Sequence, residues 1–414
     1  MRRLLGPIGL LTFVFCFACA AGAQEWTRFR GPNGDGLSDS VFPSKITDAD
    51  WAWKIDLPGG GHSSPVLWGD KIFLTSGDDD SGRQTVLCLN AADGKQIWRR
   101  DFDARTFSKH MNNSYASSTP AVDADRVYLC WTTPEELTLF ALDHSGTELW
   151  RAHLGVWVSQ HGGGQSPTIV GDIILLPGIS EGEHSFLFGI DKKTGRVVWQ
   201  TPMAKTDKFC PATPCLYQPK DGPQQAIFLS KVEAMSGVDP QTGKILWQSP
   251  GVFDARAVGS PVIWHDIVFG SCGDGPKGHQ LAAVHAGAEG KPAKKAWLTE
   301  TDTPYVTTML LKHDLLFCWG DNGIVTCRQP ETGKIVWQNR VPGSAYFGSP
   351  VCAGETIYAV SQAGDLVSIA AKDKFELLGR LQLKEKCEST PAIAGGRMFV
   401  RTYSHLYCVL AKGK

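Results

Sequence analysis

The nine residues Asp191-Lys192-Lys193-Thr194-Gly195-Arg196-Val197-Val198-Trp199 decide the fold of this chain. An equivalent run, Asp239-Pro240-Gln241-Thr242-Gly243-Lys244-Ile245-Leu246-Trp247, follows soon after it. The Asp side chain can cap its own turn, and the Gly accepts the positive φ that a tight hairpin requires. The Trp brings a large flat surface and an indole N–H, which suit it to packing between neighbouring sheets. The run is therefore typical of the last hairpin of a small, repeated β-sheet.

The same hairpin recurs along most of the chain. Its copies end at Trp98, Trp150, Trp199, Trp247, Trp297 and Trp337. An insertion disrupts the turn before Trp297, and a seventh copy has Leu378 in the position of the Trp. Together with Trp53, these tryptophans are predicted to dock each sheet onto its neighbour.

A second signature precedes each hairpin: Ser or Thr, then Pro, then alternating apolar residues. It is clearest at Ser64-Pro65-Val66-Leu67-Trp68, and the copy at Thr308-Met309 is degenerate. The copies start at Ser64, Thr119, Ser166, Thr213, Ser260, Thr308, Ser349 and Thr390. A period of roughly 45 residues fits one four-stranded antiparallel blade of a β-propeller. In the first copy, strands are expected at about 64–68, 71–75, 85–90 and 95–100.

The last copy supplies only three strands, the third near Tyr407-Cys408-Val409-Leu410. A fourth is available at the other end of the chain in Trp51-Ala52-Trp53-Lys54-Ile55, with Trp53 in the docking position. This pairing removes the exposed edge that an open sheet would present. The sequence therefore predicts an all-β, eight-bladed propeller over residues 51–412, closed by an N-terminal strand and preceded by an arm at 24–50.

The first 23 residues have the features of a secretory signal peptide. Arg2 and Arg3 precede an apolar stretch, and Ala21-Gly22-Ala23 provides the small residues of a cleavage site after Ala23. We therefore expect a periplasmic or secreted protein. Lipid anchoring through Cys19 is a less favoured alternative, because Cys16 stands where a lipoprotein signal has an aliphatic residue.

Charge and cysteine content limit the partners. The formal net charge of −1 favours neither nucleic acid nor an anionic membrane surface. No segment after the signal has the roughly 20 apolar residues that are needed to cross a bilayer. Separately, we expect the protein to be a monomer. A disulfide between Cys318 and Cys327 is one option if Asn322-Gly323 forms a two-residue turn. The redox state of Cys210 and Cys215 stays open.

The Asp-x-x-Thr-Gly-x-x-x-Trp unit resembles the tryptophan-docking repeat of pyrroloquinoline-quinone (PQQ)-type propellers. That superfamily includes quinoprotein alcohol dehydrogenases and the outer-membrane-assembly lipoprotein BamB, and the resemblance covers residues 51–412. The stretch 26–36 is also similar to the opening of many exported proteins of this repeat class. The repeat describes a structural unit, so the resemblance does not establish that quinone binds.

In such a blade, the turns between the second and third strands share one face with the inter-blade loops. The loops of this long-loop face include 99–118 and 151–165 and are the expected place for binding. Candidate contact residues on it are His110, Asn112, Asn113, Trp157, His161, Arg256, Tyr346 and Phe347. Trp157 can either anchor a partner or pin its own loop.

No nucleophile elbow, phosphate-binding loop or zinc-protease motif occurs in the sequence, and no catalytic or metal-binding residue is assigned. We expect a non-catalytic, exported scaffold that binds a protein or cell-envelope component, with a BamB-like role in outer-membrane protein assembly as one option. The alternative that the resemblance implies is a quinoprotein dehydrogenase using PQQ and calcium. Against it, the chain has no adjacent pair of cysteines, no long insertions and no assignable set of calcium ligands. No cofactor is therefore expected outside this alternative.

Overall fold

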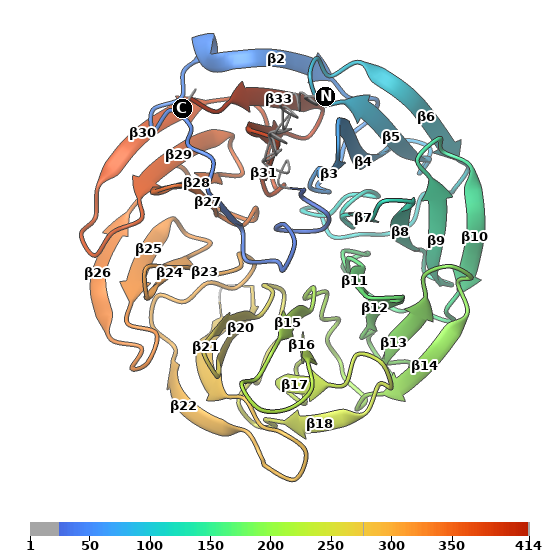
Figure 1. Cartoon of the computed structure of the whole chain (residues 1–414), viewed down its shortest axis with the longest axis vertical. Helices are drawn as coiled ribbons and strands as arrows, with labels where there is room; N and C mark the ends of the chain where they lie inside the picture. Colours follow the sequence, from blue (N-terminus) through green and yellow to red (C-terminus); the bar gives the residue numbers. More distant parts are fainter. Residues whose placement is uncertain (1–24, 276, 413–414) are drawn as a thin grey trace, which may run out of the picture.

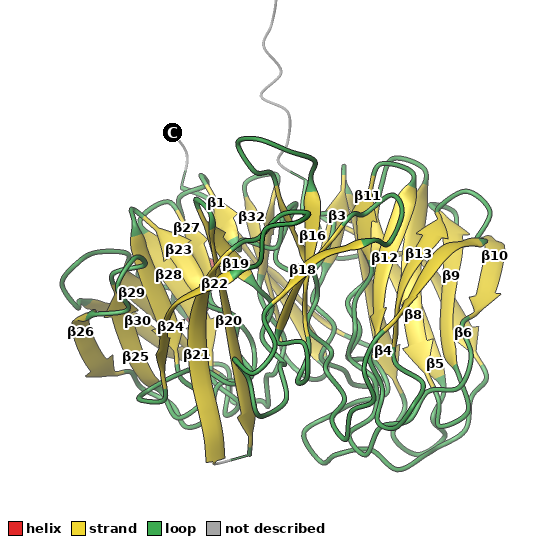
Figure 2. Ribbon diagram, turned by 90° about the horizontal axis from the view of Figure 1, so that it is seen from below, coloured by secondary structure: helices red, strands yellow, loops and turns green. Residues whose placement is uncertain are grey.

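The computed structural model describes residues 25–275 and 277–412; the predicted signal peptide lies outside them. Eight antiparallel sheets of four strands stand around a central channel, and blade 7 gains a fifth, parallel strand (Figure 1). The predicted all-β, eight-bladed propeller is confirmed. Figure 2 shows the sheets edge-on, with loops on both faces of the ring.

Each blade runs outward from the axis in chain order, and blade 8 takes its outermost strand from the N-terminal region. Blades 1 to 4 comprise β3 (Val66–Trp68), β4 (Lys71–Gly77), β5 (Gln84–Asn90) and β6 (Gln96–Phe102); β7 (Ala121–Val122), β8 (Arg126–Thr132), β9 (Leu137–Asp143) and β10 (Glu148–His153); β11 (Thr168–Val170), β12 (Ile173–Gly178), β13 (Phe186–Asp191) and β14 (Val197–Pro202); β15 (Cys215–Tyr217), β16 (Gln225–Leu229), β17 (Met235–Val238) and β18 (Ile245–Gln248).

The second half of the ring repeats this order. Blades 5 to 8 comprise β19 (Val262–Trp264), β20 (Ile267–Asp274), β21 (Lys277–His285) and β22 (Lys294–Thr299); β23 (Leu310–Lys312), β24 (Leu315–Trp319), β25 (Ile324–Arg328) and β26 (Ile335–Arg340); β27 (Val351–Ala353), β28 (Thr356–Val360), β29 (Asp365–Ala370) and β30 (Leu377–Gln382), with β1 (Leu37–Ser38) beside β27; β31 (Ala392–Ala394), β32 (Arg397–Arg401), β33 (His405–Leu410) and β2 (Trp51–Asp56). A short 3-10 helix, η1 (Asp48–Asp50), precedes β2.

Seven of the eight outer strands of the described chain carry a docking tryptophan, and most of these contact the turn of the next blade. The indole N–H donates to a backbone carbonyl of that turn in Trp98 (His144, 2.9 Å), Trp150 (Lys192, 3.1 Å), Trp199 (Pro240, 3.1 Å), Trp297 (Pro330, 2.8 Å) and Trp337 (Lys372, 2.9 Å). Trp247 differs, because its indole donates to Gln225 within its own blade (2.6 Å). A small residue faces each ring from the third strand: a Cβ on Gly189 would lie 2.1 Å from the Trp199 indole.

Ring closure follows the predicted pairing. β2 is antiparallel to β33, with Trp53 opposite Cys408. The Trp53 indole donates to the carbonyl of Ala91 in blade 1 (3.4 Å), so the N-terminal strand both completes blade 8 and contacts the first blade.

In blade 7 the structure corrects the predicted residue at the position of the docking tryptophan. Ser368 is paired with Gly379, so Gly379 occupies the Trp position, and Leu378 is the extra residue of a β-bulge. A Cβ on Gly379 would lie 2.9 Å from Lys45 Cα, and the Ser368 hydroxyl donates to the carbonyl of Ser44. The N-terminal arm therefore fills the space that an indole fills in other blades.

The arm, residues 25–50, crosses the centre of the ring (dark blue in Figure 1). Trp26 forms an antiparallel bridge with Leu67 in blade 1, and the Thr27 carbonyl accepts a bond from the Val122 N–H in blade 2 (2.8 Å). Farther along, β1 joins β27 in blade 7. The arm thus connects distant blades before it reaches η1 and β2.

Two buried arginines hold the arm inside the channel. Arg28 Nη1 donates to the carbonyl of Pro214 (2.7 Å). Arg30 Nη1 donates to the carbonyl of Pro350 (2.7 Å), and Nη2 to that of Met309 (2.9 Å). These bonds satisfy carbonyls at the inner ends of blades 4, 6 and 7, so the arm closes one end of the channel.

The disulfide between Cys318 and Cys327, which the sequence leaves as one option, is not formed. The turn spans residues 320–323, which places Cys318 opposite Thr326 and Phe317 opposite Cys327. Because alternate strand residues face opposite sides, the two thiols lie in different cores. The ten cysteines of the described chain, Cys210 and Cys215 included, are buried and free. Within the same residues, no helix has the length and apolar character needed to cross a membrane.

Candidate functional site

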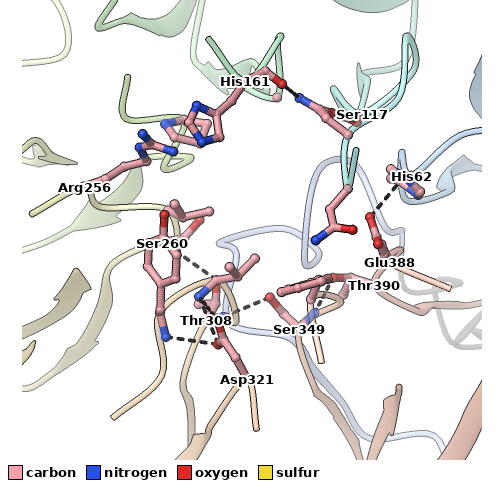
Figure 3. Close-up of a pocket in the computed structure, with 18 of the residues that line it drawn as sticks. His62, Ser117, His161, Arg256, Ser260, Thr308, Asp321, Ser349, Glu388 and Thr390 are labelled. Atoms are coloured by element: carbon pink, nitrogen blue, oxygen red, sulfur yellow. Dashed lines mark hydrogen bonds and ion pairs between the residues drawn. The ribbon is translucent and has the colours of Figure 1, made fainter. Parts of the chain in front are cut away.

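The channel opens on the long-loop face as a cavity of about 850 Å³, with Phe29 of the arm in its wall (Figure 3). Every blade contributes the Ser or Thr of its repeat and the residue two positions before it. The first ring is Ser64, Thr119, Ser166, Thr213, Ser260, Thr308, Ser349 and Thr390, and the second is His62, Ser117, Gly164, Pro211, Val258, Val306, Phe347 and Glu388. Residues two apart in an extended chain share one face, so both rings face the axis.

Neighbouring members of the first ring, the Ser and Thr residues of the repeats, are hydrogen-bonded to one another and form a hydroxyl belt. Between six pairs of neighbouring blades, the hydroxyl accepts a bond from the backbone N–H of the preceding ring member, as from Ser64 to Thr119 (2.9 Å). The belt also closes between the last blade and the first, where the Thr390 N–H donates to Ser64 Oγ (3.2 Å). The two pairs outside this pattern both involve Thr213. The belt fixes the inner strands, and therefore the loops above them.

Arg256 lies in the wall of the cavity, in the loop between blades 4 and 5. Its side chain is 4% exposed, yet within the described chain its guanidinium has no hydrogen bond and no ion pair. Its backbone carbonyl accepts a bond from the Gly273 N–H (2.9 Å), which anchors the residue in place. Figure 3 shows the guanidinium beside His161.

Two histidines lie next to this arginine. The rings of His110 and His161 are stacked, with centroids 5.1 Å apart and planes at 12°. Burial and then the charge of Arg256 lower the pKa of His161 to about 4, so its imidazole is neutral at pH 7. His161 Nδ1 is buried without a partner.

A second polar group lies across the cavity in blade 8. His62 Nε2 is 3.1 Å from Glu388 Oε2, although neither His62 nitrogen has hydrogen-bond geometry. Burial lowers the pKa of His62 well below its usual value and raises that of Glu388. The other Glu388 oxygen accepts bonds from Gln362 (2.5 Å) and Lys386 (3.1 Å). Gln362 also donates to Asn112, so the loop after blade 1 reaches across to blade 7 (3.1 Å).

Two further carboxylates of the wall have donors of their own. Asp321 accepts bonds from the backbone N–H groups of Tyr305 and Val306 (3.1 Å each), while burial raises the pKa of its carboxyl group. Asp274 Oδ2 accepts a bond from Lys208 Nζ (2.8 Å). Among residues 25–275 and 277–412, no three His, Cys, Asp or Glu side chains are grouped so that they could hold a metal ion.

Six of the eight predicted contact residues line this cavity: His110, Asn112, Asn113, His161, Arg256 and Phe347. The other two are in the core. Trp157 is 2% exposed and packs edge-on against Phe209 (5.0 Å between centroids). Tyr346 packs against Trp319 (5.4 Å) and is fully buried. Trp157 therefore pins its own loop, and Tyr346 does not face the cavity.

The sequence reasoning missed His62, Glu388 and Asp321. A usable signal exists for the first two, because each stands two residues before a repeat Ser or Thr, as Phe347 does. Asp321 belongs to the turn between β24 and β25, which has no fixed spacing from a repeat Ser or Thr that would identify it.

A family model described as outer membrane protein assembly factor BamB matches residues 21–209, 211–339 and 321–413. Among solved structures, BamB from Moraxella catarrhalis is similar with a TM-score of 0.61 and 15% identity, over 88% of this chain and 98% of that one. Quinohemoprotein alcohol dehydrogenase from Comamonas testosteroni has a TM-score of 0.63 and 12% identity, over 94% and 81%. The computationally designed Ika8 protein has a TM-score of 0.62 and 12% identity, over 87% and 99%. No curated protein matches the sequence. At these identities the solved structures show a shared fold.

Proposed function

Because this chain belongs to the family of the outer membrane protein assembly factor BamB, we propose that it is a non-catalytic scaffold of the cell envelope. It binds a partner protein through the long-loop face, and the assembly of outer-membrane proteins is the first process in which to look for that partner. The predicted signal peptide and the envelope role in the family description support this location.

The observation that carries the proposal is the asymmetry of the channel. The arm closes one end with buried, hydrogen-bonded side chains, whereas the other end is a cavity of about 850 Å³. Loops of this face also expose apolar side chains: Met111 at 83%, Val156 at 52% and Val158 at 43%. Exposed apolar groups around a concave site are typical of a protein-binding surface.

Site-specific photo-crosslinking in the native envelope tests the proposal. A photoreactive amino acid replaces Met111 or Val158 on the face, or Ile335 on the outer strand β26 as an exposed apolar control. We expect one dominant protein adduct from the face positions and none from position 335. Equal adducts from all three positions, or none from the face, would overturn the proposal.

A second candidate, a PQQ-dependent dehydrogenase, is favoured by the cavity itself. Its volume lies within the roughly 300–1,000 Å³ typical of cofactor sites, and a quinohemoprotein alcohol dehydrogenase has a similar fold. The carboxylates do not fit a calcium-held quinone, because Glu388 and Asp321 already accept bonds from Gln362 and from backbone N–H groups. Purified protein mixed with PQQ and Ca²⁺ decides the matter. A tight complex that reduces a dye with alcohols would establish the dehydrogenase and overturn the scaffold.

A further inference from the structure

Arg256 is exceptional among the buried arginines. Among residues 25–275 and 277–412, five arginines are buried: Arg28, Arg30, Arg256, Arg328 and Arg401. Four of them donate to backbone carbonyls; Arg328, for example, bonds the carbonyls of Thr301 (2.7 Å) and Gly333 (3.0 Å), and Arg401 that of Thr75 (2.7 Å). Throughout the described residues, Arg256 alone of the five has no such bond. Its environment therefore lacks the acceptors that the fold supplies to the others.

A buried, unpaired guanidinium is unfavourable for folding. The residue is only 4% exposed, its Nε is buried without a hydrogen-bond partner, and none of its five N–H donors has an acceptor within the described chain. Nearby carboxylates do not remove the deficit, because Asp274 is bonded to Lys208 and Asp321 to backbone N–H groups. The guanidinium instead faces the cavity, where an anion from outside can reach it (Figure 3).

The surroundings restrict the anion. His161 offers a buried, unpartnered Nδ1 next to the arginine, and a neutral imidazole can donate one hydrogen bond there. The hydrogen bond from Lys208 lowers the pKa of Asp274, which therefore keeps its negative charge in the same wall and disfavours a doubly charged phosphate. A single carboxylate matches the planar fork of the guanidinium with two parallel bonds.

We propose that the cavity binds the carboxylate of an acidic peptide segment, with Arg256 as its charged donor and His161 as a second donor. This assignment rests on the proposed function and names the chemistry that the partner presents. The peptide source is favoured because Met111 and Val158 expose apolar surface on loops that flank the cavity residues His110 and His161. A protein segment can contact these loops while its acidic group enters the cavity.

Fluorescence anisotropy with three pools of labelled random hexapeptides tests the proposal on the full mature chain. One amidated pool carries a fixed glutamate, a second carries glutamine instead, and a third carries glutamine with a free C-terminal carboxylate. We expect the glutamate pool to bind about tenfold or more tightly than the amidated glutamine pool, as for a charge-assisted hydrogen bond. The third pool distinguishes a side-chain carboxylate from a chain terminus, and tight binding of either carboxylate pool supports the proposal.

Variants locate the carboxylate. Arg256→Gln should abolish the preference, and Arg256→Lys should retain part of it, because charge remains but the fork is lost. Arg100→Gln removes an exposed arginine from β6 and should change nothing. Thermal melting checks that each variant is folded. Binding of both carboxylate pools no tighter than that of the amidated glutamine pool, or a carboxylate preference that survives Arg256→Gln, would overturn the proposal. Succinate binding as tightly as the glutamate pool would overturn the peptide assignment.

Crosslinking at Met111 in the Arg256→Gln background separates this proposal from the scaffold function. An adduct that persists while the peptides show no carboxylate preference leaves the scaffold standing and removes only the carboxylate site. Loss of the adduct in this variant supports both.

Discussion

Arginines are buried at both ends of the central channel: Arg28 and Arg30 at the arm end are paired, whereas Arg256 in the wall of the loop-end cavity is not. Arg30 donates to backbone carbonyls of two blades, and Arg28 donates to the carbonyl of Pro214 and the hydroxyl of Thr168. At the loop end, Arg256 is comparably buried and its guanidinium has no hydrogen bond within the described chain; the same holds for the ring nitrogens of His62 and Nδ1 of His161. The same residue type therefore serves the fold at one end and awaits an outside group at the other.

The paired arginines at the arm end contribute to the stability of the fold, whereas the unpaired groups at the loop end reduce it and are available for binding. Unpaired buried polar groups lower the stability of a fold, so they are expected where a ligand supplies the missing bonds. The two ends should respond to substitution with opposite signs.

The largest effect is expected at the arm end. Arg30→Met removes bonds to the carbonyls of Gly34 (3.1 Å), Met309 (2.9 Å) and Pro350 (2.7 Å) and leaves these acceptors unsatisfied. We expect the free energy of unfolding to fall by about 3–5 kcal/mol. Urea denaturation measures it, with Arg100→Met as the exposed control. A loss below about 1 kcal/mol would contradict the role assigned to Arg30.

At the loop end the sign reverses. Arg256→Met removes a buried charge that has no partner, so we expect the free energy of unfolding to rise by about 1–3 kcal/mol while carboxylate binding is lost. The same denaturation experiment gives the value. A destabilisation similar to that of Arg30→Met would show that Arg256 is structural and would erase the contrast.

Acid should weaken the loop end through His161. Its pKa is about 4 in the fold and near 6.5 unfolded, so the unfolded state gains a proton first as the pH falls. Stability is therefore lost between pH 6.5 and 4. Arg256, His110 and Lys208 oppose protonation, whereas Asp274 favours it. His161→Asn should reduce this loss by about 1–2 kcal/mol, since the partly exposed ring is screened by solvent.

Melting temperatures of the unsubstituted protein and of His161→Asn, measured at pH 7.5 and 4.5, test the His161 prediction. His62 remains in the variant and contributes in the same sense. Glu388 and Asp321, with raised pKa values, contribute in the opposite sense in both proteins. Identical pH dependence of the two proteins would refute a neutral, buried His161.

The smallest effect concerns the hydroxyl belt between the two ends. Thr119→Val removes the acceptor of the Ser64 N–H (2.9 Å) and should lower the free energy of unfolding by about 1 kcal/mol. Thr213→Val is the matched control, because Thr213 is the ring member outside the belt. Equal effects of the two substitutions would mean that the belt bond contributes nothing measurable.

The sequence predicts the ring because each blade carries its own local signals. Ser or Thr before Pro, the Asp-to-Gly turn and the docking Trp recur with one period, and Trp53 completes the set. The alignment was wrong at Leu378, since a β-bulge shifts the outer strand by one residue and gives Gly379 the Trp position. The local sequence pattern reveals neither this bulge nor the arm residues Ser44 and Lys45, which fill the space of the missing indole.

The site was less predictable. The loop residues His110, His161 and Arg256 were identified by their face, but their convergence depends on three inter-blade loops that meet at the axis. The role of the arm was also hidden, because Arg28 and Arg30 bind backbone carbonyls, which have no signature in the sequence. Trp157 illustrates the converse, a side chain typical of an interface that the fold uses as core.

The pairing of β2 with β33 has a consequence for the order of assembly. Trp51 in β2 lies opposite Val409 in β33, so β2 can pair only after nearly the whole chain has been synthesised. Contacts of such sequence separation are slow to form, and the entropy of closing so long a loop must be overcome before they contribute. Individual blades can form hairpins early. The toroid, its arm and the cavity between them arise together in a final step, once the last residues have emerged.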